Sequence, residues 1–497
     1  MTEPFLADGA STARQSAVVA ASFLLGTALG GLLGLVIGIV LGESAATDSL
    51  LAAYSLYLVF ALFGGNVRVA LVPLIGVGGT DAELRGRAAD AVGRLSAVAV
   101  VLAGTLVVLS PALGEALNTG DLKTAITSLA ILAVASGLQV AAASQAAALA
   151  AALRFVASAG LYVVSSAAAL VLATGFMLAF GAVGAAIGVL GGSAVLYLGH
   201  VAYLRRLGVH AGVAVGQLGD RRTWRMAGAA SGGSAVPLAS QAMLTIALAA
   251  VAGVVGTVTA YTYGYFVALL LASVTAGAIG FTSMPGLVGD LGSRGADAAL
   301  GYLRTFAALG AFLYVPLGAA VATFGRPVID RALAGPLSVE TLDLMWDILR
   351  IFLVMGVCFV ILTPVNTLAL SMQRLRAFVF AAVVAVVAQL VIVVPLGRTV
   401  GPEAVAIAHA TIAVGMILLV AVGVFGRGMP AAVASAVVAA LPAIGLAVVF
   451  PLLGLVAPDG WFASICFSVI GIGLYVGLGA LLWPAVARPM LAAVLRR

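Results

Sequence analysis

The 497-residue chain is 63% hydrophobic and only 8% charged, and its mean hydropathy is +1.22. So little polar surface cannot cover a soluble globule, and the composition therefore indicates a membrane protein with many spans. The two cysteines, Cys358 and Cys466, stand alone in apolar runs, which excludes a disulfide framework and a thiolate metal site.

Apolar runs long enough to cross a hydrocarbon core of about 30 Å as helices fill almost the whole chain. Charges or Gly/Pro clusters separate about fourteen such runs of roughly 18 residues or more. They lie near residues 16–42, 49–77, 95–117, 124–152, 155–179, 182–203, 227–252, 255–281, 305–325, 344–370, 378–396, 401–424, 431–456 and 462–485. The sequence therefore predicts an all-α polytopic membrane protein.

The basic residues orient these spans by the positive-inside rule. With the amino terminus in the cytoplasm, most of the 24 basic residues fall in cytoplasmic segments. They are Arg14, Arg85, Arg87, Arg94, Arg154, Arg205, Arg206, Arg221, Arg222, Arg225, Arg294, Arg304, Arg374, Arg376, Arg427, Arg488, Arg496 and Arg497. The net charge of +6 is thus mainly an orientation signal for a protein of the cytoplasmic (inner) membrane with both termini inside. Nucleic-acid binding has no support.

The spans divide into two lobes of six helices and a final pair. The expected parts are a cytoplasmic tail (1–15), an N-lobe (16–206), a basic cytoplasmic linker (207–226), a C-lobe (227–425), a helix pair (431–485) and a second cytoplasmic tail (486–497). The first apolar run carries no small-residue cleavage site, so we expect it to be retained. No Gly-rich phosphate loop is present, so an ion gradient, the membrane potential or the substrate's own gradient would have to drive any transport.

The run from Thr47 to Leu74 carries the strongest functional candidates. Arg68 lies deep in its second half, and a charge at the bilayer centre costs at least about 2.5 kcal/mol. The arginine either snorkels to the cytoplasmic interface or faces a central cavity, where its planar fork would bind a phosphate or diphosphate. Asn66 would add a polar contact there. Asp48, at the start of the run, is either an N-cap or a group that serves gating or ion coupling on the outer side.

Glycine recurs every four residues in the first span, at Gly26, Gly30, Gly34, Gly38 and Gly42. Such a stripe provides a flat face for close packing of a neighbouring helix. Alternatively, it lets the helix bend during transport, because glycine costs a helix about 1 kcal/mol relative to alanine. Gly30 and Gly34 are therefore gating candidates.

A second run, from Thr257 to Leu287, echoes the first in opening on threonine and gathering small residues and tyrosines. Because the two runs share the same predicted orientation, we expect the lobes to be parallel repeats about an axis along the membrane normal. Tyr265 in this run and Gln241 in the preceding span are candidate substrate contacts.

Other polar side chains in the spans have structural as well as functional interpretations. Asp347 and Arg350 are expected to pair on one helix face. His409 either relays protons or is neutral and hydrogen-bonded. Pro364, followed by Asn366, predicts a break in the tenth span. The spans contain no acidic residue near mid-membrane, no histidine cluster and no Ser-His-Asp set, so neither a membrane hydrolase nor a metal or cofactor site is expected.

Three stretches resemble the MurJ (MviN) type lipid II flippases of the MOP exporter superfamily. They are ATDSLLAAY followed by LFGGNVRVALVP, then GTVTAYTYGYFVALLLASVTAGAIGFTSMPGL, and ALSMQRLRAF with the small-residue twelfth span. The resemblance implies two six-helix lobes around a central cavity, alternating access, and two C-terminal helices that form a groove for a polyprenyl tail. It also implies that Asp48 matches a family position and that Arg68 falls within a residue or two of a polar one.

The chain departs from the family pattern by lacking its cavity arginines. The first span, from Ser16 to Gly42, has no charge. In the second, the family's Pro-Asn and the paired arginines after it are replaced by Tyr57, Leu58 and the apolar Ala61 and Leu62. In the eighth, Tyr263-Gly264-Tyr265 replaces an expected arginine.

The sequence thus predicts a transporter rather than an enzyme. It would be a flippase that moves a lipid-linked saccharide precursor, lipid II or a related polyprenyl-diphosphate sugar, across the cytoplasmic membrane for peptidoglycan or envelope biogenesis. Its expected partners are this anionic substrate, membrane lipids and envelope-synthesis proteins. Two alternatives stay open. A MATE-type drug or metabolite antiporter would need an acidic coupling residue inside a lobe, and a non-transporting scaffold of an envelope-synthesis complex would suit the loss of the arginines.

Overall fold

The computed structural model describes residues 12–76, 80–273, 275, 278–372, 374–484 and 486, with side chains omitted in some helical stretches, of which 62–70 and 278–294 are the longest. Apart from an isolated bridge between Ala334 and Leu337, the regular structure of these residues is helical. Eight described helices are long and apolar enough to cross a membrane, or nine if a bent pair forms one span. The chain is an all-α, multi-pass membrane protein, as predicted.

The expected spans coincide with helices, although two continuous apolar segments each contain two of them. α5 (Phe155–Arg206) contains the fifth and sixth spans, and the segment Pro402–Gly454 contains the twelfth and thirteenth. Contacts between residues divide the chain into two compact units, one of residues 1–259 and 378–401 and the other of residues 260–377 and 402–497. In this division the seventh and eleventh spans pack with the first unit, whereas we expected them in the C-lobe.

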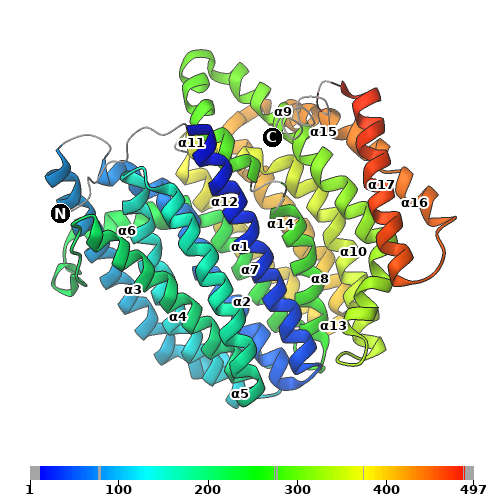
Figure 1. Ribbon diagram of the computed structural model, residues 1–497, viewed down its shortest axis with the longest axis horizontal. Helices are drawn as coiled ribbons and strands as arrows, with labels where there is room; N and C mark the ends of the chain where they lie inside the picture. Colours follow the sequence, from blue (N-terminus) through cyan, green and yellow to red (C-terminus); the bar gives the residue numbers. More distant parts are fainter. Residues whose placement is uncertain are drawn as a thin grey trace. The chain divides into compact units, whose positions relative to one another are not determined.

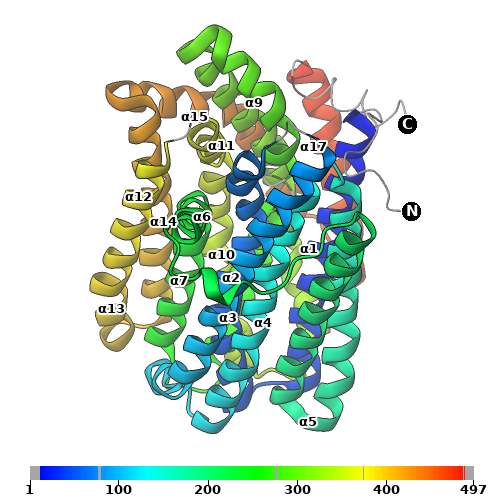
Figure 2. The ribbon, with the colours of Figure 1, turned by 90° about the vertical axis from the view of Figure 1, so that its left-hand side faces the viewer.

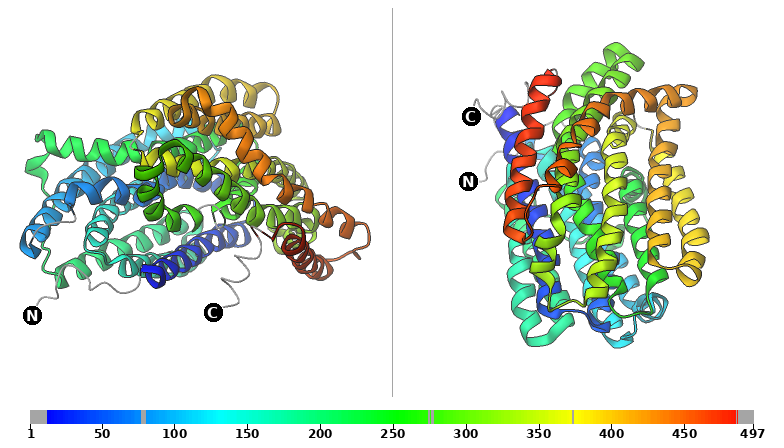
Figure 3. Two further views of the ribbon diagram at one scale, coloured as in Figure 1. Left: turned by 90° about the horizontal axis from the view of Figure 1, so that it is seen from above. Right: turned by 90° about the vertical axis from the view of Figure 1, so that its right-hand side faces the viewer.

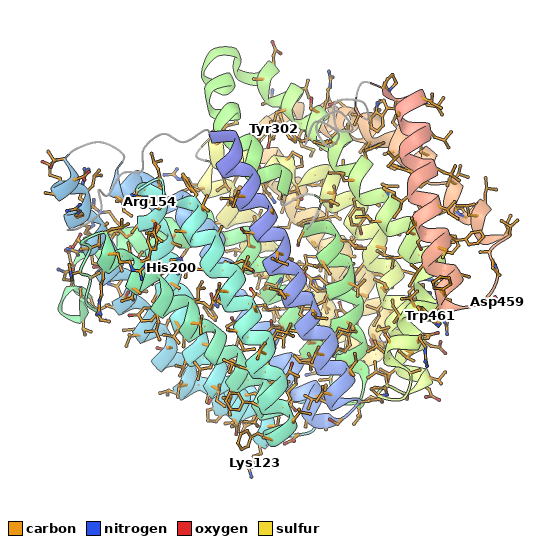
Figure 4. All side chains as sticks on the ribbon, viewed as in Figure 1. Lys123, Arg154, His200, Tyr302, Asp459 and Trp461 are labelled. Carbon is orange, nitrogen blue, oxygen red and sulfur yellow. The ribbon has the colours of Figure 1, made fainter. Side chains whose placement is uncertain are left out.

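The first unit is a bundle of long helices. It contains α1 (Thr12–Leu41), α2 (Ala45–Ile75), α3 (Asp81–Leu117), α4 (Leu122–Ala151), α5, the short η1 (Val215–Gln217), α6 (Arg221–Gly233), α7 (Ala235–Val251), most of α12 (Leu375–Ala388), the π-helical η3 (Gln389–Val393) and α13 (Val394–Thr399). α1 lies against α5 (Figure 1). Figure 2 shows α2, α3 and α4 side by side. Lys123, in the first turn of α4, and Arg154, at the start of α5, lie at opposite ends of this bundle (Figure 4).

α5 is a helical hairpin that reverses at Gly181. This glycine has φ 58° and ψ −140°, a backbone conformation that L side chains rarely adopt. The two arms then touch backbone to backbone, since a β-carbon at Gly188 would lie 2.1 Å from the α-carbon of Ala173, and one at Gly192 would lie 2.5 Å from the β-carbon of Ala169. Small residues at these positions are therefore what allow the fifth and sixth spans to pack together.

The seventh span is bent rather than straight. α6 and α7 meet at an angle of 69°, where the sequence reads Gly232-Gly233-Ser234 and where Pro237 follows in the first turn of α7. Glycine and serine weaken a helix at a kink, and proline lacks the N–H that would continue the ladder. The helix was expected from residue 227, but it begins at Arg221, because Asp220 caps its amino end through a hydrogen bond from the Arg222 N–H.

The second unit contains the remaining helices. They are α8 (Thr257–Ala272), whose first turn belongs to the first unit, α9 (Ala278–Leu333), α10 (Val339–Leu362), α11 (Pro364–Ser371), α14 (Pro402–Phe425), η4 (Gly426–Gly428), α15 (Met429–Leu446), α16 (Val449–Gly454) and α17 (Trp461–Leu482). α15 and α17 both pack against α9 (Figure 3). At the break predicted in the tenth span, α10 ends at Leu362 and α11 begins at Pro364, while Thr363 between them keeps a helical backbone conformation. The Phe359 carbonyl accepts from both the N–H and the hydroxyl of Thr363, each at 2.7 Å.

Candidate functional site

Polar side chains at the start of α2, among them the candidate Asp48, form hydrogen bonds with other parts of the first unit. Ser44 is the N-cap of α2, and its hydroxyl accepts from the Thr47 N–H at 3.1 Å. Asp48 therefore lies one turn inside the helix and does not cap it, so the N-cap interpretation of Asp48 is wrong for its own helix. Its carboxylate is left available for partners elsewhere.

The Asp48 carboxylate caps a different helix. One oxygen accepts from the Gly256 N–H at 2.9 Å, and the other accepts from the Thr259 N–H at 2.9 Å and from the Thr259 hydroxyl at 2.6 Å. Gly256 and Thr259 are the N-cap and third residues of α8, so these donors are groups that a helix start leaves unsatisfied. Asp48 is 2% exposed, and the three donors, together with the positive end of the α8 dipole, stabilise its buried charge.

The turn between α7 and α8 needs glycine to present these donors. Gly253 has φ 123° and Gly256 has φ 88°, both in the region that favours glycine. The neighbouring Ser49 anchors a second loop, because its hydroxyl lies 2.6 Å from that of Thr119 and donates to the Asp121 carbonyl at 3.1 Å. The first turn of α2 thus holds both the α7–α8 turn and the α3–α4 loop.

Further along α2, two buried side chains, Ser55 and Tyr57, form hydrogen bonds with other helices of the first unit. The Ser55 hydroxyl lies 3.0 Å from that of Thr245 on α7. The Tyr57 hydroxyl accepts from the Gln139 amide of α4 at 3.0 Å and lies 3.3 Å from the Ser193 hydroxyl of α5. These contacts join four helices of the first unit through uncharged groups. The local sequence around Gln139 contains no signal that would assign it these partners.

Three of the predicted substrate contacts lie in the first unit. Asn66 and Arg68 belong to the backbone of α2, and their side chains lie outside the described residues. Gln241 on α7 is 1% exposed, and its Oε1 atom has no hydrogen-bond partner among the described atoms. A buried amide oxygen without a donor is costly, so Gln241 is available for a ligand or a water.

Tyr265 lies in the second unit within an aromatic cluster around His409. The Tyr265 ring stacks on the imidazole with centroids 5.5 Å apart and planes at 22°, and Phe352 meets both rings edge-on. The Tyr261 hydroxyl lies 3.0 Å from Nδ1 of His409. The hydrogen bond expected for His409 is therefore present. Tyr265 is 3% exposed, so a substrate would reach it only after this cluster rearranges.

Gly264, between the two tyrosines of this segment, lets α8 approach α10 closely. A β-carbon there would lie 3.0 Å from the Met345 carbonyl oxygen and from the Leu349 nitrogen. The rings of Tyr265 on α8 and Phe352 on α10 meet beside this close approach.

The glycine stripe of α1 is not uniform. A β-carbon at Gly26 would lie 2.4 Å from the Tyr162 ring of α5, so close packing holds at this position. A β-carbon at Gly30 or Gly34 would meet no described atom of another segment within 4 Å. Close packing therefore holds at Gly26, while at Gly30 and Gly34 both interpretations of the stripe, packing and bending, stay open.

Among the remaining candidates, the pair expected between Asp347 and Arg350 is confirmed, at 3.5 Å and with both side chains more than half exposed. Cys358 and Cys466 are free. Within the described part of the chain, no group of three or more His, Cys, Asp or Glu side chains is arranged to hold a metal ion.

No protein-family model and no curated protein sequence matches the chain. Solved structures do match. The lipid II flippase MurJ, in an inward closed conformation, superposes with a TM-score of 0.75 at 14% identity, over 94% of this chain and 99% of that one. A MATE protein in complex with MaL6 gives a TM-score of 0.57 at 16% identity, over 85% and 96% of the two chains. A MOP superfamily transporter from Pyrococcus furiosus gives 0.53 at 15% identity, again over 85% and 96%.

These likenesses define the class of protein by its fold. The chain is a polytopic all-α membrane protein whose fold is like those of these MurJ, MATE and MOP superfamily transporter structures, with the higher TM-score to MurJ. The resemblance inferred from the sequence is confirmed at this level.

Proposed function

We propose that the protein is a MOP-type transporter that moves a lipid-linked saccharide precursor, lipid II or a related polyprenyl-diphosphate sugar, across the cytoplasmic membrane by alternating access. The observation that carries this proposal is the superposition with a lipid II flippase over 94% of the chain. The substrate would be anionic, since its diphosphate is the chemistry that a guanidinium and buried amides recognise.

In this proposal Arg68 binds the diphosphate, with Asn66 and Gln241 as further polar contacts in the first unit, and Tyr265 is a substrate contact in the second unit. The unpartnered Oε1 of Gln241 supports its part, because a sugar hydroxyl is a suitable donor. The helix pair at 431–485 would guide the polyprenyl tail. Membrane lipids, and proteins of envelope synthesis, would be the partners of such a flippase.

Gating is assigned to Asp48, Gly30 and Gly34. The Asp48 carboxylate fixes the first turn of α8 through three hydrogen bonds, so breaking this cap frees the α7–α8 turn. With both termini in the cytoplasm, this cap lies at the outer end of α2 and would hold the outer side closed. Gly30 and Gly34 would let α1 bend when the cap releases, because glycine weakens a helix.

The MATE-type antiporter is the second candidate, supported by a TM-score of 0.57 over 85% of the chain. An antiporter of this kind would exchange a small cationic molecule for protons or sodium. The flippase is favoured by the higher TM-score and wider coverage of the MurJ structure. The scaffold interpretation predicts a phenotype that is indifferent to cavity mutations.

The test is a transport assay in proteoliposomes loaded with a fluorescent polyprenyl-diphosphate sugar, accompanied by native mass spectrometry of the solubilised protein. We compare the wild type with Arg68→Ala, and we use Arg350→Ala as the matched control because Arg350 is an exposed arginine already paired with Asp347. The flippase proposal expects transport and a retained polyprenyl-phosphate lipid in the wild type and in Arg350→Ala, with both lost in Arg68→Ala. Proton- or sodium-dependent efflux of a small cation without lipid transport would replace it with the antiporter.

A further inference from the structure

The connection from α5 to α6 carries a strongly basic exposed surface. Arg205 and Arg206 end α5, and Arg221 and Arg225 lie on α6, all with exposed side chains. None of these four forms an ion pair with an acidic side chain among the described residues, and Trp224 lies between the last two. We call Arg205, Arg206, Arg221, Trp224 and Arg225 the linker surface.

The orientation of α6 places part of this surface along the membrane rather than across it. α7 is an apolar helix of 17 residues, and α6 is inclined to it by 69°. If α7 crosses the bilayer, α6 lies close to the bilayer plane. The inner face of α6 carries the buried Thr223, Met226 and Ala230. Its outer face carries Arg221, Trp224 and Arg225, spaced by three and four residues and therefore adjacent on one side of the helix.

Arg94 of α3 locks α6 in this position and also engages the nearby acidic groups. Its guanidinium donates to Asp220 at 2.5 Å, to Asp90 at 2.7 Å and to the Thr223 hydroxyl at 3.0 Å. Asp90 also pairs with Arg222 at 3.4 Å. Both carboxylates of this region are therefore occupied by Arg94 and Arg222, and the charges of the linker surface are left without internal compensation.

Trp224 gives the surface the character of a membrane interface. Its side chain is 54% exposed, while its Nε1 donates to the Leu218 carbonyl at 2.7 Å and so holds the ring in place. Val213 and Val215, in the connection before α6, are 45% and 56% exposed. A fixed indole and exposed aliphatic groups beside arginines are the combination that favours the boundary between headgroups and acyl chains.

We propose that the linker surface binds the headgroups of anionic phospholipids in the membrane that contains the protein. Arginine matches phosphate oxygens in a bidentate manner, and four uncompensated cations favour a lipid with net negative charge over a zwitterionic one. The indole and valines enter the adjoining acyl region. This site lies outside the proposed transport cavity, so the inference stands whether or not the protein is a flippase.

Fluorescence quenching by brominated lipids tests the proposal directly. The chain has four tryptophans, so the triple variant Trp346→Phe, Trp461→Phe, Trp483→Phe retains Trp224 as its only fluorophore. It is placed in phosphatidylcholine nanodiscs that contain an equal minor fraction of brominated phosphatidylglycerol or brominated phosphatidylcholine. We expect the brominated phosphatidylglycerol to quench Trp224 about fivefold more strongly than the brominated phosphatidylcholine does. This ratio should fall below about twofold in the variant Arg221→Gln/Arg225→Gln or at high salt.

Arg374→Gln/Arg376→Gln is the matched control, because it removes the same charge from two exposed arginines outside the linker surface. It should leave the quenching ratio unchanged. Equal quenching by the two lipids, no quenching by either, or the same loss in the control would each overturn the proposal. Native mass spectrometry provides a second test if the triple variant does not fold. Chains with the native tryptophans should retain phosphatidylglycerol, and Arg221→Gln/Arg225→Gln should retain severalfold less.

Discussion

The carboxylate of Asp48 and the hydroxyl of Thr259 lie 2.6 Å apart, although 211 residues separate them. Most helix caps come from the residue that precedes the helix, and such a cap moves with its helix. The cap of α8 comes instead from the first turn of α2. The α8 start therefore keeps its hydrogen bonds only while α2 and the α7–α8 turn stay together, which makes the contact releasable in a way that a local cap is not.

Removing the Asp48 carboxylate should destabilise the protein and weaken the proposed closure of its outer side. Asp48→Ala leaves the Gly256 and Thr259 donors buried without an acceptor, and each costs about 1–3 kcal/mol. We expect a clear drop in the thermal unfolding temperature. The unfolding temperature of Asp48→Asn should lie between those of Asp48→Ala and the wild type, because the asparagine amide retains one acceptor oxygen. An Asp48→Ala protein as stable as the wild type would contradict the capping role.

The hydroxyl of Thr259 permits a double-mutant cycle. Thr259→Val removes that donor and keeps the backbone N–H, so it should cost about 1–2 kcal/mol, less than Asp48→Ala. If the two side chains act through the 2.6 Å contact, the double variant will be less destabilised than the sum of the single variants. The measurement is thermal or denaturant unfolding in detergent. Strict additivity would mean that the contact contributes no coupling energy.

Local patterns in the sequence were enough to predict the helical architecture and some pairs. Hydropathy located the spans, Pro364 located the break in the tenth, and the three-residue spacing brought Asp347 and Arg350 together. Such features depend on residues within one or two turns of each other. Asp48 was identified as a candidate for the same reason, since a carboxylate at a helix start is conspicuous.

The partners of these candidates were not predictable, because they come from distant segments. Tyr57, Gln139 and Ser193 lie on three different helices, and nothing in the spacing of the sequence links them. The N-cap interpretation of Asp48 failed because the rule is local and Ser44, four residues earlier, already serves as the cap. Bundle packing decides these contacts, and periodicity contains no information on it.

The hydrogen bond between His409 and Tyr261 should stabilise the second unit. His409→Phe keeps an aromatic ring in the cluster but leaves the Tyr261 hydroxyl without this partner, at a cost of about 1–3 kcal/mol. Tyr261→Phe alone should be similarly costly if Nδ1 loses its partner. The double variant removes both polar groups and should recover part of the lost stability, as measured by thermal unfolding. A double variant that is less stable than either single variant would argue against the pairing.

The Asp220 contacts predict a dependence of stability on pH. A hydrogen bond from the Arg222 backbone N–H, followed by one from the Arg94 side chain, lowers the pKa of Asp220. A lowered pKa in the folded state means that the carboxylate stabilises the protein at pH values above its unfolded pKa of about 3.9, and that this stabilisation disappears as the pH falls through the lower folded value. The difference in unfolding temperature between wild type and Asp220→Asn should therefore be largest near neutrality and shrink below about pH 4. A difference that grows on acidification would contradict this assignment.

Two glycines of α1 should respond in opposite ways to the same substitution. Gly26→Ala would push a β-carbon into the Tyr162 ring, 2.4 Å away, and we expect a loss of about 1–3 kcal/mol. Gly30→Ala meets no such contact and should stabilise the helix by up to about 1 kcal/mol. If α1 bends during transport, Gly30→Ala will also slow transport, because the gain in helix stability opposes bending. A variant that is more stable and slower would support the gating role of Gly30, whereas one that is more stable and equally fast would remove it.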